Sequence, residues 1–299
     1  MSASLPHHPS SFRDPSGFVF EKEGIVYRQV NAVFKEHFDL FIHSGCYEKL
    51  VKQQLLIPHQ PIHENLTGNT EWYITLKPEQ IECITYPWEW SFDMLKDAAL
   101  LTLRITKEAI SSGLILKDAT PYNVQWHKGK LIFIDTLSFE KYDADEPWIA
   151  YRQFCETFLA PLLLMHYKKQ SLHPLLLAWP EGIPLSIARS LMPGRSRFSL
   201  HVYLHIHLHA KIAGQKKGNA GIRSKFSRQK MLNLITSLEL LIGKLGLKGR
   251  STTWSDYYEE ASLRKNYLEQ KKNIIGQWLD SLPGINTASD LGANEGEFS

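Results

Sequence analysis

One stretch decides the fold: residues 114–135 read Leu-Ile-Leu-Lys-Asp-Ala-Thr-Pro-Tyr-Asn-Val-Gln-Trp-His-Lys-Gly-Lys-Leu-Ile-Phe-Ile-Asp. Its apolar runs predict short strands, and His-Lys-Gly-Lys at 127–130 predicts a hairpin turn between two of them. Asp118 and Asn123 stand on either side of a Thr-Pro turn, and Asp135 follows a buried strand. The hairpin therefore predicts that Asn123 and Asp135 lie close together.

Three side chains of this stretch, Asp118, Asn123 and Asp135, carry oxygen ligands only. Such ligands suit Mg²⁺ that is carried by a phosphate-rich molecule. A second carboxylate nearby can orient or deprotonate a hydroxyl group. The alternative is structural, because Asp and Asn side chains often hydrogen-bond the backbone of a tight turn.

The residues before this stretch predict a small antiparallel sheet with one helix. The β-rich runs are residues 18–30, which fold back at Glu23-Gly24, residues 72–76 and residues 81–86. Residues 37–56 have apolar positions at helical spacing and predict one helix, which Pro58 ends.

Helices are expected to dominate the remainder. Ser91 is expected to cap a helix over residues 92–111 that ends near Gly113. The further helical stretches are residues 147–179, 199–210, 229–245 and 254–282.

The run from Lys117 to Asn123, followed by Phe-Ile-Asp at 133–135, resembles the catalytic loop and metal-binding Asp of the protein-kinase-like superfamily. The resemblance is strongest to its aminoglycoside and choline kinase branch. It implies a two-lobed fold and Mg-ATP as ligand, with Asp118 as the base and Asn123 and Asp135 as metal ligands. Leu116 stands where that superfamily usually has His.

The resemblance also implies a cationic side chain on a strand and an acidic partner on a helix. For the cation, Arg28 and Lys35 are the alternatives, and Glu48 is the candidate for the acidic partner. The glycines at 17 and 24 are too far apart to form a Gly-rich phosphate loop.

The last ten residues read Asp-Leu-Gly-Ala-Asn-Glu-Gly-Glu-Phe-Ser, and the spacing of their glycines fits the first strand-to-helix turn of a Rossmann-like domain. They resemble motif I of class I S-adenosylmethionine-dependent methyltransferases. The resemblance implies that Asp290, Gly292, Asn294 and Gly296 bind S-adenosylmethionine.

Further runs, at residues 117–126, 133–140, 147–155 and 252–258, resemble the N-terminal region of a bacterial methyltransferase family. On these runs the chain is identified as a member that stops after motif I. The implied function is methyl transfer to an unknown acceptor, with the kinase-like region serving recognition or regulation. The alternative is a kinase-like phosphotransferase or a nucleotide-binding pseudokinase module that uses Asp118, Asn123 and Asp135.

These patterns predict an α+β chain in five parts. The parts are a disordered tail (1–16), a small β-rich lobe (17–90), a larger helical lobe (91–250), a linker helix (251–282) and the start of a truncated S-adenosylmethionine-binding domain (283–299).

Positive charge is concentrated in one segment. From Gly182 to Leu238 there is no Asp or Glu but there are 10 Lys and Arg residues, although the net charge of the chain is only +3. This segment predicts an acidic or phosphate-bearing partner. The alternative is a solvated basic surface that the acidic remainder of the chain balances.

Two weaker patterns bear on metal binding and location. His201, His205 and His209 have the spacing of one helical face, which is compatible with zinc or with partly exposed polar positions. The three cysteines form no CxxC pair, and no apolar run is long enough to cross a bilayer. We therefore expect a cytoplasmic protein without a membrane span.

Overall fold

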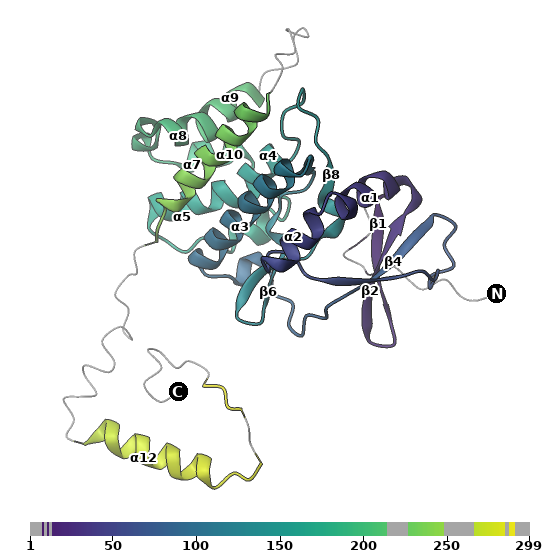
Figure 1. Ribbon diagram of the computed structural model, residues 1–299. Helices are drawn as coiled ribbons and strands as arrows, with labels where there is room; N and C mark the ends of the chain where they lie inside the picture. The colour runs from purple at the N-terminus through teal and green to yellow at the C-terminus, as the bar shows by residue number, and fades with distance from the viewer. Residues whose placement is uncertain are drawn as a thin grey trace. The chain divides into compact units, whose positions relative to one another are not determined.

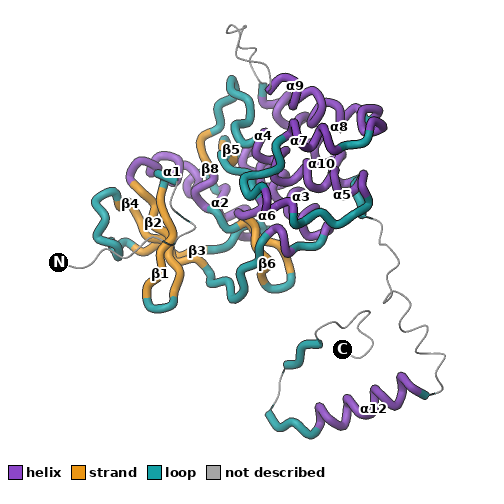
Figure 2. Tube along the Cα trace, turned by 180° about the vertical axis from the view of Figure 1, so that it is seen from behind, coloured by secondary structure: helices purple, strands orange, loops and turns teal. Residues whose placement is uncertain are grey.

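The computed structural model describes residues 8, 11, 14–213, 227–247, 266–284 and 287–290. Contacts divide the chain into two units, Met1–Leu247 and Lys248–Ser299. The first unit is α+β, with its large sheet and its helices in separate regions (Figures 1 and 2).

The β-rich part of the first unit is a four-stranded antiparallel sheet. Its strands, in the spatial order β1-β2-β4-β3, are β1 (Gly17–Lys22), β2 (Ile25–Asn31), β4 (Trp72–Pro78) and β3 (His59–Ile62). The predicted hairpin is present, because Glu23 and Gly24 both have positive φ and join β1 to β2 in a two-residue turn. Phe20 and Val30 of this hairpin are completely buried.

Two helices, rather than the single one predicted over 37–56, separate β2 from β3. They are α1 (Lys35–His43) and α2 (Cys46–Lys52). The chain breaks between them at Gly45, whose φ of 76° lies in the left-handed region. Apolar residues keep a helical spacing on both sides of Gly45, so the sequence pattern did not indicate this interruption.

The strand predicted over residues 81–86 is absent, and this prediction was wrong. The third neighbour in the sheet is β3, which pairs with β4 from His59↔Pro78 to Ile62↔Thr75. After β4 the side chain of Gln80 accepts a hydrogen bond from Val26 N (2.8 Å) and donates one to Val26 O (3.1 Å). A side chain therefore occupies the backbone groups that another strand would need.

The helical part begins with α3 (Phe92–Ser111), within the predicted bounds. Ser91 caps it by accepting a hydrogen bond from Met94 N (3.1 Å), which satisfies one free amide of the first turn. Ten residues of this helix are buried, and the helix contacts α10 (Arg228–Gly243) and the strand β7 (Lys130–Phe133). The helix forms the centre of the larger hydrophobic core.

The remaining helices of this unit complete its helical part (Figures 1 and 2). They are α4 (Tyr151–Phe154), α5 (Ala160–Lys168), α6 (Leu175–Ala178), α7 (Leu185–Leu191), α8 (Leu200–Val202) and α9 (His209–Ala213). Two π-helical segments, η5 (Cys155–Leu159) and η7 (Tyr203–Leu208), continue α4 into α5 and α8 into α9. The predicted helical stretches are thus present, but the wider π turns were not foreseen.

Residues 114–141 form two short antiparallel strand pairs. They are β5 (Leu114–Leu116) with β8 (Phe139–Lys141), and β6 (Val124–His127) with β7 (Lys130–Phe133). The segment after α2 joins β7 through a parallel bridge at Leu56↔Phe133. Ile57 N donates to Phe133 O and Phe133 N donates to Leu55 O, both at 2.9 Å, so this bridge ties the sheet region to the helical region.

The start of the chain differs from a disordered tail where it is described. His8 N donates to Val19 O (2.7 Å), and Val19 N donates to the Ser11 hydroxyl (2.9 Å). These bonds satisfy both backbone groups of Val19 in β1, so His8 and Ser11 lie against the edge of the sheet. The other residues of 1–13 lie outside the described part.

The second unit contributes α12 (Tyr267–Asp280), which covers part of the linker helix predicted over 251–282. Residues 248–265 lie outside the described part. Residues 287–290, where the Rossmann-like strand was expected, form no strand. Among the helices that the structure describes in both units, none has the length and apolar character needed to span a membrane.

Candidate functional site between the sheet and the helical lobe

The turn-and-strand segment 114–141 brings its polar residues together by pairing its two ends. β5 pairs with β8 from Leu114↔Lys141 to Leu116↔Phe139. Lys117 N then donates to Ser138 O, and Ile134 N donates to Asn123 O, both at 2.8 Å. As predicted, the backbones of Asn123 and the strand end before Asp135 are adjacent.

Asp135 is the most constrained residue of this site. It is 9% exposed and forms an ion pair with Arg28, which projects from β2 of the sheet. The Ser138 hydroxyl donates to the other carboxylate oxygen, Oδ2, and Leu137 N donates to Oδ1 at 3.2 Å. Burial alone would raise the pKa of Asp135, but the Arg28 charge and these hydrogen bonds hold it below the ordinary value. Asp135 is therefore a charged, fully engaged carboxylate.

Asp118 lies in a different environment although it is close to Asp135. Burial, and then the negative charge of Asp135, raise the pKa of Asp118 above its ordinary value. The amide of Gln153 on α4 donates to Asp118 Oδ1 (3.3 Å), and its oxygen accepts from Ala119 N (2.6 Å). Gln153 thus fixes the loop on which Asp118 lies. The role of Asp118 as a base stays a prediction.

Asn123 shares a partner with Asp135. Its amide nitrogen donates to the Ser138 hydroxyl at 3.1 Å, and that hydroxyl donates to Asp135. Ser138 therefore connects two of the three residues that the sequence singled out. The sequence could have indicated Ser138, because it lies three residues after Asp135, and Ser and Asp side chains at this spacing form local turn hydrogen bonds. In the structure it ends the short 3₁₀ helix Thr136–Ser138.

A second ion pair lies beside the first. Lys117 Nζ is 3.2 Å from Asp14 Oδ1 and donates to the Ser16 hydroxyl at 2.7 Å. The same ammonium lies 4.7 Å from the centre of the Phe34 ring. Sequence reasoning missed Asp14 and Ser16, because it treated them as part of a tail.

We call Arg28, Lys117, Asp118, Asn123, Asp135 and Ser138 the interlobe cluster. Of the two candidate cations, Arg28 belongs to it. Lys35 lies instead over the Tyr73 ring, 5.1 Å from its centre. Glu48, the candidate for the acidic partner, is exposed on α2, and Asp135 takes the place expected for it beside Arg28.

The interlobe cluster as arranged does not fit a magnesium ion. A metal ligand needs free oxygen lone pairs, whereas both carboxylate oxygens of Asp135 accept hydrogen bonds and Arg28 already supplies the opposite charge. Among the described residues no group of three or more His, Cys, Asp or Glu side chains is arranged to hold a metal. Metal ligation by Asn123 and Asp135 therefore stays a prediction that this geometry does not favour.

His201 and His205 belong to a hydrogen-bonded network, whereas His209 only stacks on a neighbouring ring and its Nδ1 is buried without a partner among the described residues. His201 Nδ1 and His205 Nε2 each lie 2.8 Å from the Ser237 hydroxyl, and His205 Nδ1 lies 2.7 Å from the Tyr151 hydroxyl. The ring of His209 stacks on Tyr151 at 4.8 Å. Burial, with the charges of His201 and His209, lowers the pKa of His205 to about 4. We call His201, His205, Ser237 and Tyr151 the histidine network.

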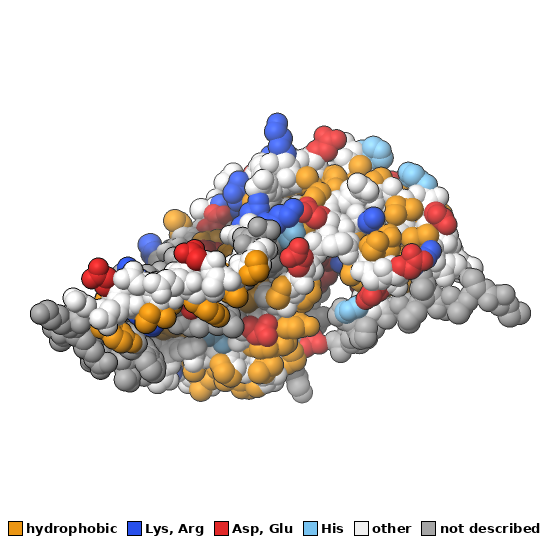
Figure 3. Space-filling view, turned by 90° about the horizontal axis from the view of Figure 1, so that it is seen from below, with side chains coloured by type: hydrophobic (Ala, Val, Ile, Leu, Met, Phe, Trp, Pro, Cys, Tyr) orange, Lys and Arg blue, Asp and Glu red, His pale blue; other side chains and the backbone are white. Residues whose placement is uncertain are grey.

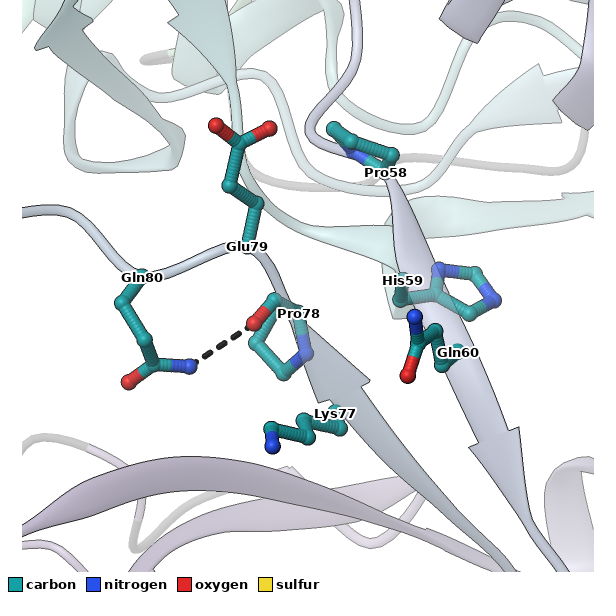
Figure 4. A pocket seen from close by; sticks show the side chains of 7 residues that line it. All are labelled: Pro58, His59, Gln60, Lys77, Pro78, Glu79 and Gln80. Carbon is teal, nitrogen blue, oxygen red and sulfur yellow. Dashed lines mark hydrogen bonds between the residues drawn. The ribbon is translucent and has the colours of Figure 1, made fainter.

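A pocket of about 410 Å³ lies at the end of the β3–β4 pair, where Pro58, His59 and Gln60 face Lys77 to Gln80 (Figure 4). Gln80 in this pocket donates to Pro78 O at 2.7 Å. Glu79 is occupied by an ion pair with Lys128 and by His127 at 3.2 Å. Glu79 and Gln80 of the pocket are thus already paired, whereas His59 Nδ1 is buried without a hydrogen-bond partner among the described residues.

Comparison with family models finds no match. Among curated proteins the chain is similar to the nodulation protein NoeA of Rhizobium meliloti (strain 1021), with 30% identity over 302 residues. The alignment covers 97% of this chain and 62% of NoeA, so the chain spans less than two thirds of its relative. Among solved structures it is similar to vaccinia related kinase 3, with 12% identity and a TM-score of 0.36, covering 81% of this chain and 92% of that one. A likeness at that score carries no weight for the fold.

These comparisons overturn the identification as a truncated methyltransferase. The relative that aligns along nearly the whole chain is NoeA, and no methyltransferase model matches. The error has a physical cause, because a short glycine-containing turn is compatible with many folds when no parallel sheet accompanies it. Asp290 is exposed, no strand lies within the described residues 287–290, and Gly292, Asn294 and Gly296 lie outside the described residues. S-adenosylmethionine as a cofactor and a methyl acceptor as a substrate were expected only from the resemblance to that family, so neither is proposed further.

Proposed function

We propose that the first unit is a kinase-like module that binds a nucleoside triphosphate at the interlobe cluster, with Arg28 as its phosphate contact. The observation that carries this proposal is the ion pair between Arg28 of the sheet and Asp135 at the end of β7. A strand cation and a loop carboxylate meet there beside Asp118, between a β-rich and a helical region.

The order of the elements supports the proposal. A hairpin bearing Arg28 is followed by two helices, two strands, a linker and the long helix α3. The loop with Asp118 and Asn123 comes next, and then the strand that ends at Asp135. This is the order that the resemblance to the kinase-like superfamily implies for nucleotide-binding residues.

Arg28 has the chemistry required of a phosphate contact. A guanidinium group offers several donors in a plane and pairs with phosphate through two parallel hydrogen bonds. Arg28 contacts Asp135 through one terminal nitrogen, Nη1, whereas a guanidinium group carries five N–H donors. A phosphate group can therefore bind the remaining donors while the ion pair with Asp135 stays formed.

Binding, rather than phosphoryl transfer, is the activity proposed. Transfer requires groups that neutralise charge on the phosphates during reaction, typically a metal ion and a glycine-rich backbone loop. The hairpin before Arg28 turns in two residues, Glu23 and Gly24, and both oxygens of Asp135 are engaged. Magnesium has no part in the proposal.

Thermal denaturation with ATP tests the proposal. A ligand that binds only the native state stabilises it by an amount that grows with its concentration over Kd, about 2.7 kcal/mol at 100-fold excess. We expect ATP to raise the melting temperature whether Mg²⁺ or EDTA is present, and Arg28→Met to remove that rise. Lys35→Met is the matched control and should keep it.

Two outcomes would contradict the proposal. One is the absence of any shift at millimolar ATP. The other is an equal shift in the wild type and in Arg28→Met, each measured against its own ligand-free baseline. Arg28→Lys keeps the charge and distinguishes a lost phosphate contact from a lost fold, since it should retain part of the shift.

A further inference from the structure

A second concave site lies in the helical lobe, away from the residues of the interlobe cluster. It is a pocket of about 320 Å³ formed where α7, the 3₁₀ helix η6 (Gly194–Phe198) and α9 meet. Its walls include Ser186, Arg189 and Ser190 of α7, Gly194 and Arg197 of η6, and Ala210 of α9. Figure 1 shows α7 and α9 together in this part of the molecule, and the two helices are in contact.

Helical geometry explains why these polar side chains share one pocket. Ser186, Arg189 and Ser190 are at positions i, i+3 and i+4 of α7, which lie on one face of an α-helix. Gly194 and Arg197 are three residues apart in η6, and residues at that spacing eclipse each other in a 3₁₀ helix. Two short helices therefore present one arginine each to the same space.

The wall that carries Arg197 is fixed from behind. The Ser196 hydroxyl and His207 Nε2 are 2.9 Å apart and share a hydrogen bond, and both residues are buried. This bond attaches η6 to the π-helical segment η7. Pro193 precedes η6 and restricts the backbone at its entrance. The backbone position of Arg197 is thus fixed by the attachment of η6 to η7.

The two guanidinium groups lack compensation within the part of the chain that the structure describes. Neither Arg189 nor Arg197 forms an ion pair with any of those residues. Arg195, which lies between them in sequence, differs, because it donates to Tyr167 O at 3.3 Å and lies 5.8 Å from the centre of that ring. The surrounding sequence from 182 to 238 contains no Asp or Glu that could neutralise the pair.

The electrostatic effect of both arginines reaches the same buried side chain. Burial first, and then the charges of Arg197 and Arg189, lower the pKa of His207. His207 is only 5% exposed and lies behind η6. The two guanidinium groups thus generate one positive region rather than two separate charges.

We infer that this pocket binds a small soluble phosphate monoester, with Arg189 and Arg197 as the charge partners and the hydroxyl of Ser186 as a further donor. The Ser190 hydroxyl lines the pocket but already donates to Ile187 O at 2.8 Å. A phosphate monoester is a compact dianion with three terminal oxygens, which two guanidinium forks match in charge and which one hydroxyl can also contact. The pocket volume lies in the range of small-ligand sites. A nucleic acid backbone would instead need a row of cations along an open surface.

The test is calorimetric titration of the intact chain with inorganic phosphate and with glycerol 3-phosphate. We expect saturable binding that weakens roughly tenfold or more in each of Arg189→Gln and Arg197→Gln. Arg195→Gln removes the same charge outside the pocket and should bind as the wild type does. Because Arg189 and Arg197 are exposed and carry no ion pair with described residues, unchanged melting temperatures should accompany these losses.

Three results would overturn the inference. These are the absence of saturable binding by either probe, an equal loss in Arg195→Gln, and binding only to phosphatidic acid vesicles or to nucleic acid. The last would assign the positive region to a macromolecular surface. None of these variants touches Arg28, so this test and the ATP test of the interlobe cluster fail or succeed separately.

Discussion

The interlobe cluster and the histidine network hold buried polar groups in opposite ways. In the interlobe cluster Asp135 stays charged, because Arg28 and two hydrogen-bond donors surround it. In the histidine network burial, with the charges of His201 and His209, lowers the pKa of His205 to about 4, while Ser237 and Tyr151 contact its two ring nitrogens. The first arrangement holds a charged group beside the sheet, and the second joins helices through neutral groups. The difference predicts separate responses to mutation and to pH.

The largest expected effect comes from removing one charge of the interlobe cluster. Arg28→Met leaves the Asp135 carboxylate buried without its cation, which should lower the free energy of unfolding by about 3 kcal/mol. Chemical denaturation measures it. The double variant Arg28→Met/Asp135→Asn removes both charges and should recover more than half of the loss. A double variant as unstable as the single one would mean that the ion pair is not the cause.

The next effect concerns the histidine network. His205→Leu removes the His205 partner of the Tyr151 hydroxyl, and an unsatisfied buried group costs about 1–3 kcal/mol, whereas Ser237 keeps its contact with His201. The combined variant His205→Leu/Tyr151→Phe lacks the Tyr151 hydroxyl that the single variant leaves without its His205 partner, so it should be more stable than His205→Leu alone. The opposite order, again from denaturation midpoints, would show that the hydrogen bond contributes little.

The pH dependence of stability should separate the two regions. His205 has a pKa of about 4 in the folded chain against 6.5 when unperturbed, so the unfolded chain binds more protons in that window. Its stabilising contribution is therefore present above pH 6.5 and is lost as the pH falls toward 4. Asp135, whose folded pKa lies below 3.8, loses its contribution only at lower pH still.

Replacing His205 by Gln tests this order. Between pH 6.5 and 4 the variant should lose stability less steeply than the wild type, by at most about 1.4 kcal/mol per pH unit for one proton. His63→Gln, at an exposed position, is the control and should follow the wild-type slope. An unchanged slope in His205→Gln would mean that His205 is not neutral in the folded chain.

The smallest effect is expected at Lys35, the cation outside both regions. It lies over the Tyr73 ring, and such contacts are worth about 0.5–1 kcal/mol at exposed sites. Lys35→Met should therefore change the free energy of unfolding by no more than that amount. A loss as large as that of Arg28→Met would remove the distinction between the two cations.

Much of the fold follows from local patterns. The β1–β2 hairpin and α3 with its Ser91 cap lie where the sequence predicts them, because turn glycines, a capping hydroxyl and helical periodicity act within a few residues. The break at Gly45 and the loop at 81–86 were missed, since periodicity alone does not register a left-handed glycine or a competing side chain such as Gln80.

The candidate site was predictable in part. Asn123 and Asp135 were expected to approach each other, because one hairpin joins them. The choice of Arg28 over Lys35, and the contributions of Asp14 and Gln153, depend on contacts between distant segments and could not be read from spacing. The terminal glycines misled the interpretation for the converse reason, since a local motif was taken to imply a domain.

On the face of the molecule in Figure 3, acidic, basic and hydrophobic side chains are intermixed. This agrees with the division of charge in the chain, in which the basic residues of one segment are balanced elsewhere. Arg189 and Arg197 form no ion pair with the described residues. Their local surroundings, rather than the net charge of the protein, therefore make this region positive.

The parallel bridge at Leu56↔Phe133 has a mechanical consequence. Two backbone hydrogen bonds pin the chain just before β3 to a residue only two positions from Asp135. These bonds limit how far the chain that enters β3 can move from the strand that leads to Asp135. They therefore help to keep the sheet, and with it Arg28, beside that carboxylate.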